Sequence, residues 1–526
     1  MTRLQSLLLV WVVILALIAV PLAGAAGADG GPSPANSTAQ STADNNFDDP
    51  DTTTTIGYVE GYSYDDELPV DDRTDAVVDE DELEAVVYRS MARVEVIREL
   101  PFEEDVSVDV MSREEYRERN DELFAEFDEE EAFFENLRLE ALFLADRETD
   151  ATDEVEAMYG DAVAGYYDIA NDQVVVVADD PARLEVDEIT LGHELLHALQ
   201  DQYFDLGSYD RSTQNLAHAK NGLIEGDARY VDTEYEERCR DEWECLPSPT
   251  GGGGPTDFNW GLFFTFYQPY VDGPEYVEYH LADGGWEAVD SLYDDPPTSA
   301  SEVMRPGEER ERVDLDIVES DRSSEMWEPL EVEGEPATET FGEATMATMF
   351  VAGAFENRES VIDADEFRPG GTTVEYEHPE TDGWAGDEFL VYVPDGETID
   401  GEFDREALDN VGYVWETAWL TEDDAGEFAD AYRELLEING GEAIEEDVYE
   451  IEDGFTGVYH VDHDGESVTI VRAPTAEDLS EIDGSLKDDT VDESAGDGIT
   501  GAIPGFTVAT AALAILVGTA LAIRRQ

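Results

Sequence analysis

The pattern of apolar and polar residues predicts helices and a strand at the start of the folded body. Residues 76–99 carry apolar side chains at helical spacing, and a charged segment of helical character follows at 113–140. Between them, residues 106–111 alternate apolar and polar side chains, as a half-buried strand does. These segments together indicate an α+β arrangement.

Residues 165–180 predict a β-hairpin that leads into a longer helix. A tyrosine-rich run and an apolar run stand on either side of Asn171-Asp172, and these two residue types favour tight turns. Asp187 offers N-cap chemistry for the helix that comes next, and a further helix is expected over roughly 213–238.

A change in composition divides the body into two expected domains. Gly251–Gly254, ended by Pro255, marks a break, because glycine and proline interrupt regular structure. The first domain, 58–250, is expected to be α+β with a small antiparallel sheet. The second domain, 256–480, is expected to be largely helical with short strands.

The N-terminal residues have the organisation of an export signal. Residues 1–26 begin with Arg3, continue through an apolar centre and end in small residues, as a secretory signal peptide does. An uncleaved N-terminal membrane helix is the alternative. Residues 27–57 are rich in Ser, Thr, Asp and Pro without periodicity, which predicts a disordered linker.

The C-terminal residues predict attachment to a membrane. An acidic linker, 481–502, precedes an apolar run at 503–523 that is long enough to cross a bilayer. Arg524 and Arg525 follow this run, which favours a C-terminus inside the cell. The folded body is therefore expected at the extracellular face of the cell membrane.

The same C-terminal run has a more specific resemblance. Pro504-Gly505-Phe506 opens the run, and a pair of arginines closes it. This order resembles the archaeal PGF-type sorting signals, on which an archaeosortase acts. The resemblance implies that an archaeosortase-type enzyme removes the helix and that a lipid replaces it, whereas an ordinary transmembrane anchor is the alternative.

The charge of the chain is extreme and changes how its acids are interpreted. The chain has 28 basic and 131 acidic residues, a formal net charge of −103, and its only lysines are Lys220 and Lys487. Such a surplus destabilises a compact state unless salt screens it, and the Debye length shrinks to about 3 Å at 1 M salt. We therefore expect a protein adapted to high salt. Nucleic acid is excluded as a partner because the field has the wrong sign.

The two cysteines stand close together in the sequence. Cys239 and Cys245 have five residues between them, which is not a usual zinc-finger spacing, and the chain has no second pair. In an exported protein this pair predicts a small disulfide loop.

The residues with the clearest chemistry are His193, Glu194 and His197, which form an HExxH motif in a predicted helix. Positions i and i+4 lie on one helix face, so both imidazoles can bind one metal ion. Zinc suits such ligands, and a catalytic zinc site keeps one position open for water. Glu194 then stands where it can take a proton from that water. The alternative is two histidines on a helix face without a metal.

The third ligand has two candidates. Tyr203 occupies the position at which a metzincin would need a histidine. His218 and Glu225 are seven residues apart and so share a helix face. Glu225 lies among small residues in LIEGDA, which would let two helices pack closely.

At these residues the chain resembles the gluzincins, whose third ligand is a glutamate on a following helix. HELLHALQDQYFDL and LIEGDARYV are similar to segments of a group of secreted bacterial and archaeal HExxH proteins. The resemblance extends over about 160–435 and includes the segments at 284–304, 341–346, 383–392 and 417–432. It implies a zincin-like fold for the first domain, bound Zn²⁺, and Glu225 as the third ligand.

Other polar residues near the motif have open roles. His218 is a candidate catalytic residue that supports the transition state or orients a ligand, and a hydrogen-bonded structural histidine is the alternative. Tyr203 and His280 are also open as transition-state donors. Asp201 and Asp227 are candidates for a carboxylate that orients a ligating histidine.

The sequence therefore predicts a secreted, membrane-anchored zinc peptidase that acts on peptide or protein substrates, with Glu194 as general base. The alternative comes from a different class: a non-catalytic cell-surface binding or structural protein stabilised by a metal. A structural site has four protein ligands and no open position, so the two predictions differ in coordination.

Overall fold

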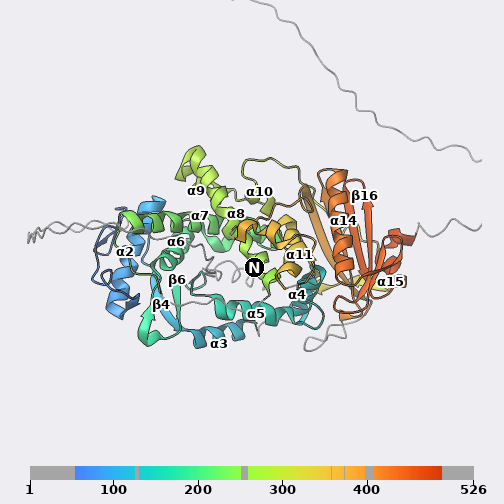
Figure 1. The fold of residues 1–526 in the computed structure, drawn as a ribbon, viewed down its shortest axis with the longest axis horizontal. Helices are drawn as coiled ribbons and strands as arrows, with labels where there is room; N and C mark the ends of the chain where they lie inside the picture. The colour runs from blue at the N-terminus through green and yellow to red at the C-terminus, as the bar shows by residue number, and fades with distance from the viewer. Residues whose placement is uncertain are drawn as a thin grey trace, which may run out of the picture. The chain divides into compact units, whose positions relative to one another are not determined.

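The structure, a computed structural model, describes residues 54–124, 129–249, 259–356, 358–371, 373–396 and 408–487 (Figure 1). Contacts group the chain into two units, Met1–Ser485 and Leu486–Gln526. The expected signal peptide, the sorting helix, the glycine-rich break and most of both linkers lie outside the described residues. Among the residues that are described, no helix is both long and apolar enough to span a membrane.

Helix α2 (Glu80–Arg98) begins where its sequence provides a complete cap. The Asp79 side chain accepts a hydrogen bond from the Glu82 amide, and the Glu82 side chain accepts one from the Asp79 amide. This capping box satisfies amides that a helix start leaves without partners. The charged segment that was expected at 113–140 forms α3 (Arg113–Phe124) and α4 (Glu129–Ala141).

The small sheet beside these helices has three strands in the order β4-β6-β5. β5 (Gly165–Asp168) and β6 (Gln173–Ala178) form the predicted antiparallel hairpin. β4 (Ser107–Ser112) runs parallel to β6, so the expected antiparallel arrangement holds for β5 and β6 only. Helices α3, α4 and α5 (Ala151–Ala162) supply the long crossover that a parallel pair requires.

Two helices follow the hairpin and carry the HExxH residues and Glu225. α6 (Glu188–Phe204) begins as predicted after Asp187, whose carboxylate accepts two amide N–H groups of the first turn. α7 (Gln214–Asp241) begins after Thr213, whose hydroxyl accepts an amide three residues further on. Helix α6 packs against both α2 and α7 (Figure 1).

Helix α8 (Trp260–Gly284) lies against α7 at very short range. Gly226 of α7 faces Gly273 of α8, and a Cβ built on Gly226 would lie 2.3 Å from the Gly273 carbonyl oxygen. A side chain on Gly226 would therefore force the two backbones apart. Glycine is the only residue that allows this approach, and the approach fixes the position of α7 next to Glu225.

The remaining described elements outside the two larger sheets and the long helices are short. They are β1 (Tyr58–Val59), β2 (Tyr62–Ser63), β3 (Val77–Val78), β7 (Leu184–Glu185), β9 (Glu331–Val332), β10 (Glu335–Pro336), α9 (Trp286–Asp294), α10 (Ala300–Met304) and α12 (Ala364–Phe367). Short 3-10 turns also occur at Pro181–Arg183, Leu206–Ser208, Pro369–Gly371 and Gly484–Lys487.

An eight-stranded antiparallel sheet dominates the C-terminal part of the described chain. The strands run in the order β11-β12-β13-β17-β16-β15-β14, and β8 also pairs with β12. Their bounds are β8 (Trp327–Pro329), β11 (Thr338–Glu339), β12 (Trp384–Pro394), β13 (Gly412–Trp419), β14 (Glu442–Glu445), β15 (Val448–Ile451), β16 (Gly457–Asp464) and β17 (Ser467–Ala473). Helices α11 (Gly342–Phe355), α14 (Glu422–Ile438) and α15 (Ala476–Ile482) pack against this sheet.

The expectation of a largely helical second domain with short strands therefore missed the extent of this sheet, although the mixed α+β class is confirmed. The central strands explain the error. Almost every residue of β12 and β13 is buried, on both faces of the sheet. Such strands lose the alternation of apolar and polar residues that marks a half-exposed strand, and short apolar runs cannot be told from buried helix by period alone.

Asp387 is the centre of the contact between this sheet and α11. One carboxylate oxygen accepts the amide of Gly342 at 2.9 Å and the Trp384 indole N–H at 3.0 Å. The other accepts the amide of Phe341 at 2.9 Å and the Trp415 indole N–H at 3.0 Å. The tryptophans of this region therefore have a structural role in the core, as packing predicts.

The sheet also binds the start of α7. Glu339, on β11, accepts the amide of Gln214 at 2.7 Å and forms an ion pair with Arg138 at 2.7 Å. The next amide of α7, from Asn215, donates to the Thr340 carbonyl at 2.9 Å. The first turn of α7 thus finds its hydrogen-bond acceptors in the C-terminal part of the chain.

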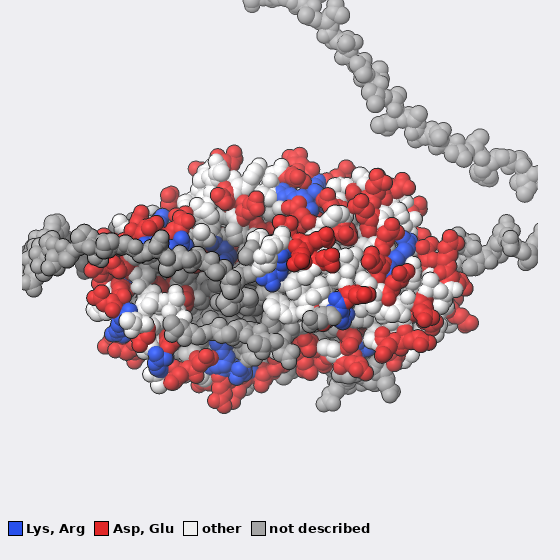
Figure 2. Space-filling view, viewed as in Figure 1, with Lys and Arg blue, Asp and Glu red and all other residues white. Residues whose placement is uncertain are grey.

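Acidic side chains are spread widely over the face of the molecule in view, and basic side chains occur on it only in small groups (Figure 2). Three buried arginines of α2 have carboxylate partners instead. Arg89, Arg93 and Arg98 of α2 are at most 1% exposed and each forms an ion pair with Asp or Glu. The arrangement agrees with the expectation that the acidic surplus is a solvated surface.

Candidate metal centre

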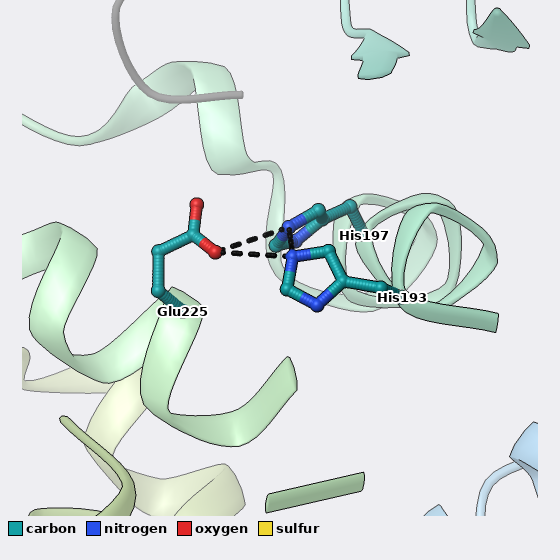
Figure 3. Close-up of side chains that lie close together, drawn as sticks. All are labelled: His193, His197 and Glu225. Atoms are coloured by element: carbon teal, nitrogen blue, oxygen red, sulfur yellow. Dashed lines mark hydrogen bonds and ion pairs between the residues drawn. The ribbon is translucent and has the colours of Figure 1, made fainter. Parts of the chain in front are cut away.

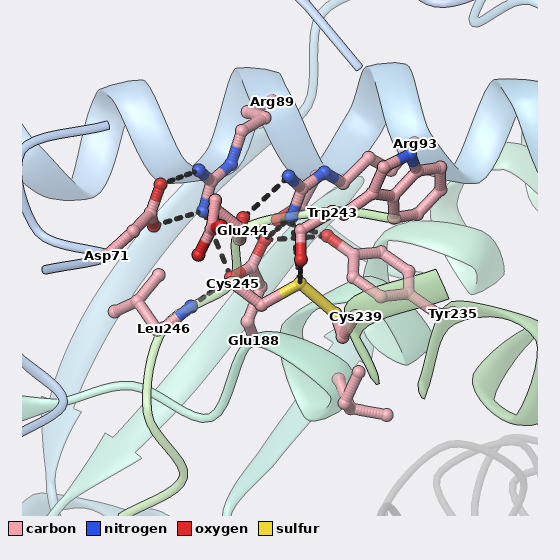
Figure 4. Close-up of a disulfide and its surroundings, with 12 residues drawn as sticks. Asp71, Arg89, Arg93, Glu188, Tyr235, Cys239, Trp243, Glu244, Cys245 and Leu246 are labelled. Atoms are coloured by element: carbon pink, nitrogen blue, oxygen red, sulfur yellow. Dashed lines mark hydrogen bonds and ion pairs between the residues drawn. A yellow bond between two sulfur atoms is a disulfide. The ribbon is translucent and has the colours of Figure 1, made fainter. Parts of the chain in front are cut away.

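The first turn of α6 is bound to its surroundings by Glu188. This carboxylate accepts hydrogen bonds from Arg93 at 2.6 Å, from the Tyr235 hydroxyl at 2.8 Å and from the Leu246 amide at 2.8 Å (Figure 4). Leu246 follows the disulfide between Cys239 and Cys245, which the sequence predicted. The disulfide loop therefore contacts the helix that carries the HExxH motif, near that helix's first residue.

His193 and His197 lie one turn apart on α6 and point to the same side (Figure 3). Each is at most 1% exposed, and their Nε2 atoms are 3.1 Å apart. Glu225 of α7 points towards both rings: its Oε2 lies 3.2 Å from His193 Nε2 and 3.4 Å from His197 Nε2. The structure thus brings the two histidines and the glutamate candidate together.

These three separations fit a single tetrahedral ion. Ligand atoms that each lie 2.0–2.1 Å from a tetrahedral zinc are about 3.3 Å from one another. The three observed distances fall within about 0.2 Å of that value. Within the described residues, this is also the group of three ligand atoms that a metal ion could share, all within 4.8 Å of one another.

Hydrogen bonds to the far ring nitrogens leave the Nε2 atoms free for a cation. His193 Nδ1 lies 2.9 Å from Asp232 Oδ2, and Arg229 also donates to this oxygen at 3.0 Å. A carboxylate can only accept hydrogen bonds, so Nδ1 of the neutral imidazole carries the hydrogen and donates it, and Nε2 keeps its lone pair. The two Nε2 lone pairs and the Glu225 carboxylate then face one another, and a cation between them would stabilise the arrangement.

The pKa shifts of His193 and Glu225 also indicate that a positive charge between these groups is favoured. Burial alone would lower the pKa of His193, but the Asp232 and Glu225 carboxylates raise it well above its usual value. Burial alone would raise the pKa of Glu225, but the imidazoles, that of His197 first, hold it at about 2. The three groups therefore favour a cation between them, and a divalent metal with nitrogen and oxygen ligands satisfies that demand.

Glu194 lies beside the three residues and lines a cavity. It is 1% exposed, and among the described residues neither of its carboxylate oxygens has a hydrogen-bond partner. Burial raises its pKa to about 7. The cavity has a volume of about 360 Å³ and is also lined by Gly165, Thr190, Val176 and Arg113.

The structure does not bring His218 to the three residues. Its Nε2 lies 2.7 Å from the Gln214 side chain, and burial lowers its pKa to about 4. Asp201 and Asp227 do not contact either histidine ring through a hydrogen bond, because Asp201 accepts from Tyr167 and Asp227 accepts from Arg98.

Asp232 is the residue that sequence reasoning missed. It lies seven residues after Glu225, so both carboxylates are on the same face of α7, and that spacing is the signal available in the sequence. Gln200 was also missed: its Oε1 lies 2.8 Å from His197 Nδ1.

Comparison with known proteins reaches only the C-terminal part of the chain. Residues 328–483 match a family described as a domain of unknown function (DUF8575). The match spans the eight-stranded sheet with α11, α14 and α15, and it leaves α6 and α7 outside. No curated protein and no solved structure matches the chain.

Proposed function

We propose that this chain is a zinc-dependent peptidase of gluzincin type, with a zincin-like N-terminal part. The observation that carries the proposal is the convergence of His193, His197 and Glu225 at the distances of a tetrahedral site, with the unpartnered Glu194 beside them. Zinc bound there would polarise a peptide carbonyl and lower the pKa of a coordinated water to about 7.

Glu194 is the general base of the proposed reaction. It would accept a proton from the attacking water and give that proton to the leaving amine as the peptide C–N bond breaks. Burial and the absence of a hydrogen-bond partner among the described residues leave both of its oxygens available for this transfer. The cavity that Glu194 lines offers room for substrate atoms next to the base.

The position of His218 supports a site with an open coordination position. A purely structural zinc site has four protein ligands. His218, the other ligand candidate in the sequence, does not supply a fourth ligand, because its Nε2 lies 2.7 Å from the Gln214 side chain. A binding protein with a metal used only for stability is therefore the weaker interpretation.

The proposal includes a location. A signal peptide, a C-terminal apolar run and the PGF-type pattern favour export and attachment to the outer face of the membrane, by the helix itself or by a lipid after an archaeosortase-type enzyme has acted. The disulfide supports this placement, because disulfides persist in oxidising environments outside the cytoplasm.

The test is Glu194→Gln, with Glu237→Gln as a control on the exposed face of α7. Both variants are purified in high salt, their zinc content is measured, and a peptide library is digested with and without a chelator. We expect Glu194→Gln to keep its zinc and to lose about 10²–10⁴-fold in cleavage rate. Unchanged cleavage would remove Glu194 as the base, and no chelator-sensitive cleavage by the wild type would refute the peptidase.

A further inference from the structure

Gln200 makes a set of hydrogen bonds that the proposed reaction does not require. Its side chain is 1% exposed, and its Oε1 lies 2.8 Å from His197 Nδ1. Its Nε2 donates to the Ile224 carbonyl at 3.0 Å and to the Tyr293 hydroxyl oxygen at 2.9 Å. One amide therefore contacts a candidate ligand on α6, the backbone of α7 just before Glu225, and a tyrosine on α9.

The hydrogen bonds continue beyond Tyr293 to α2. The Tyr293 hydroxyl donates to Asp227 Oδ2 at 2.8 Å, and Arg98 Nε donates to the same oxygen at 3.0 Å. Arg98 also forms an ion pair with Asp290 at 2.6 Å, and the Asp290 side chain is 34% exposed. This series of contacts, here called the relay, thus begins near the surface at Asp290 and ends at His197.

Each hydrogen bond in this series allows only one assignment of donor and acceptor. Arginine can only donate, so Asp227 accepts from it as a carboxylate. A hydroxyl has one proton, and Tyr293 gives it to Asp227, so the Tyr293 oxygen accepts from Gln200. A backbone carbonyl can only accept, so Ile224 fixes the same end of the amide as the donor. The Gln200 oxygen therefore faces His197 and accepts from Nδ1.

We propose that Arg98, Asp227, Tyr293 and Gln200 act as positioning residues that hold the proton of His197 on Nδ1 and aim its Nε2 lone pair at the metal. The inference rests on the metal site of the proposed function but not on peptide cleavage. Asp232 sets the same state in His193 directly, through a carboxylate. For His197 the neutral side-chain amide of Gln200 has this role. The orientation of that amide depends on the ion pair between Arg98 and Asp227, two hydrogen bonds away.

The relay also has a geometric consequence. Gln200 lies on α6 with both histidines, and Ile224 precedes Glu225 on α7. The Gln200–Ile224 bond therefore fixes the separation between the helices that supply the candidate ligands. Loss of the amide should disturb both the ring of His197 and the distance from the rings to Glu225.

The test measures zinc itself in the full chain, in high salt, by competition with a chromophoric chelator. Outer hydrogen-bond partners of metal ligands typically contribute 10–100-fold in metal affinity. We expect Gln200→Leu to raise the zinc Kd by 10–100-fold and Tyr293→Phe to raise it at least threefold. The absorption spectrum of the cobalt(II)-loaded protein should change in both variants, which a role in stability alone would not cause.

Two matched controls accompany these variants, and far-UV circular dichroism checks that each one folds. Gln202→Leu removes a side-chain amide from the same helix, and Tyr376→Phe removes a buried hydroxyl that donates to the Phe264 carbonyl. Both controls should bind zinc as the wild type does. If the wild type binds zinc, and if the zinc Kd of both Gln200→Leu and Tyr293→Phe lies within twofold of the wild-type Kd, the relay is refuted. If the wild type does not bind zinc, the metal centre and the relay both fail. Altered zinc affinity in a protein that cleaves no peptide would support the relay and remove the peptidase.

Discussion

Replacement of Gly226 by alanine tests whether the contact between α7 and α8 is as close as the structure places it. A Cβ on Gly226 would lie 2.3 Å from the Gly273 oxygen, 2.4 Å from its carbonyl carbon and 2.7 Å from its Cα. All three are backbone atoms, so no side-chain rotation can relieve the overlap. An ordinary contact begins near 3.4 Å, and the helices would have to separate locally by about 1 Å.

The magnitude follows from two opposing effects. Alanine in a helix interior is favoured over glycine by about 1 kcal/mol. Overpacking of a close contact costs about 1–3 kcal/mol, and the upper end applies where only backbone can move. We therefore expect Gly226→Ala to lower the free energy of unfolding by about 2 kcal/mol. It should also weaken zinc binding, because the shift begins next to Glu225.

The control is Gly426→Ala, a glycine in α14 whose added Cβ would meet its nearest neighbour, His463 Cε1, at 3.4 Å. There only the helix preference acts, so stability should rise by up to about 1 kcal/mol. Both variants are unfolded with urea at constant high salt and followed by far-UV circular dichroism. The packing of α7 on α8 would be refuted if Gly226→Ala unfolded at the same urea concentration as wild type, or at a higher one.

Two other predictions concern salt and the C-terminal sheet. Dilution of salt in the presence of excess zinc should unfold the protein, which loss of the far-UV circular dichroism signal would show. The reason is that the carboxylates of a chain with a net charge of −103 then repel one another without screening. A protein that keeps its fold and cleaves peptides normally in low salt would refute the adaptation to high salt. Asp387→Asn should lower the free energy of unfolding by about 3 kcal/mol or more. The asparagine amide cannot accept hydrogen bonds from all four N–H groups that Asp387 binds, and each buried donor without an acceptor costs about 1–3 kcal/mol. The exposed Glu427→Gln should change stability little, and equal urea midpoints for these two variants would contradict the role of Asp387.

The sequence predicted the parts of the site that depend on spacing within one helix. His193 and His197 share a face because they are four residues apart, and Asp187 marks the start of their helix. The choice between His218 and Glu225 could not be made in this way, because both lie on one face of α7. The close approach of α7 to α8 and the contacts of α6 determine which of the two reaches the histidines.

The roles of Asp232 and Gln200 and the extent of the C-terminal sheet could not be predicted from the sequence. In a chain with 131 acidic residues, Asp232 does not stand out from its neighbours, so only the fold identifies it as the partner of His193. Gln200 carries no charge and belongs to no motif by itself. The extent of the C-terminal sheet was underestimated, because burial on both faces removes the alternation from strands such as β13.

The contact of Glu339 and Thr340 with the first turn of α7 has a consequence for how such a chain can evolve. The region 328–483 matches a family by itself, which suggests a module that recombination moves as one piece. However, two amides at the start of α7 find their acceptors in that region. A gene that lost the region would leave those amides without acceptors, on the helix that carries Glu225. A related gene that has the HExxH helix without this region should therefore encode a replacement for the Glu339 carboxylate, such as a capping residue before α7 or another segment in its place. The two parts are thus expected to be inherited together, and their substitutions at this contact should be correlated.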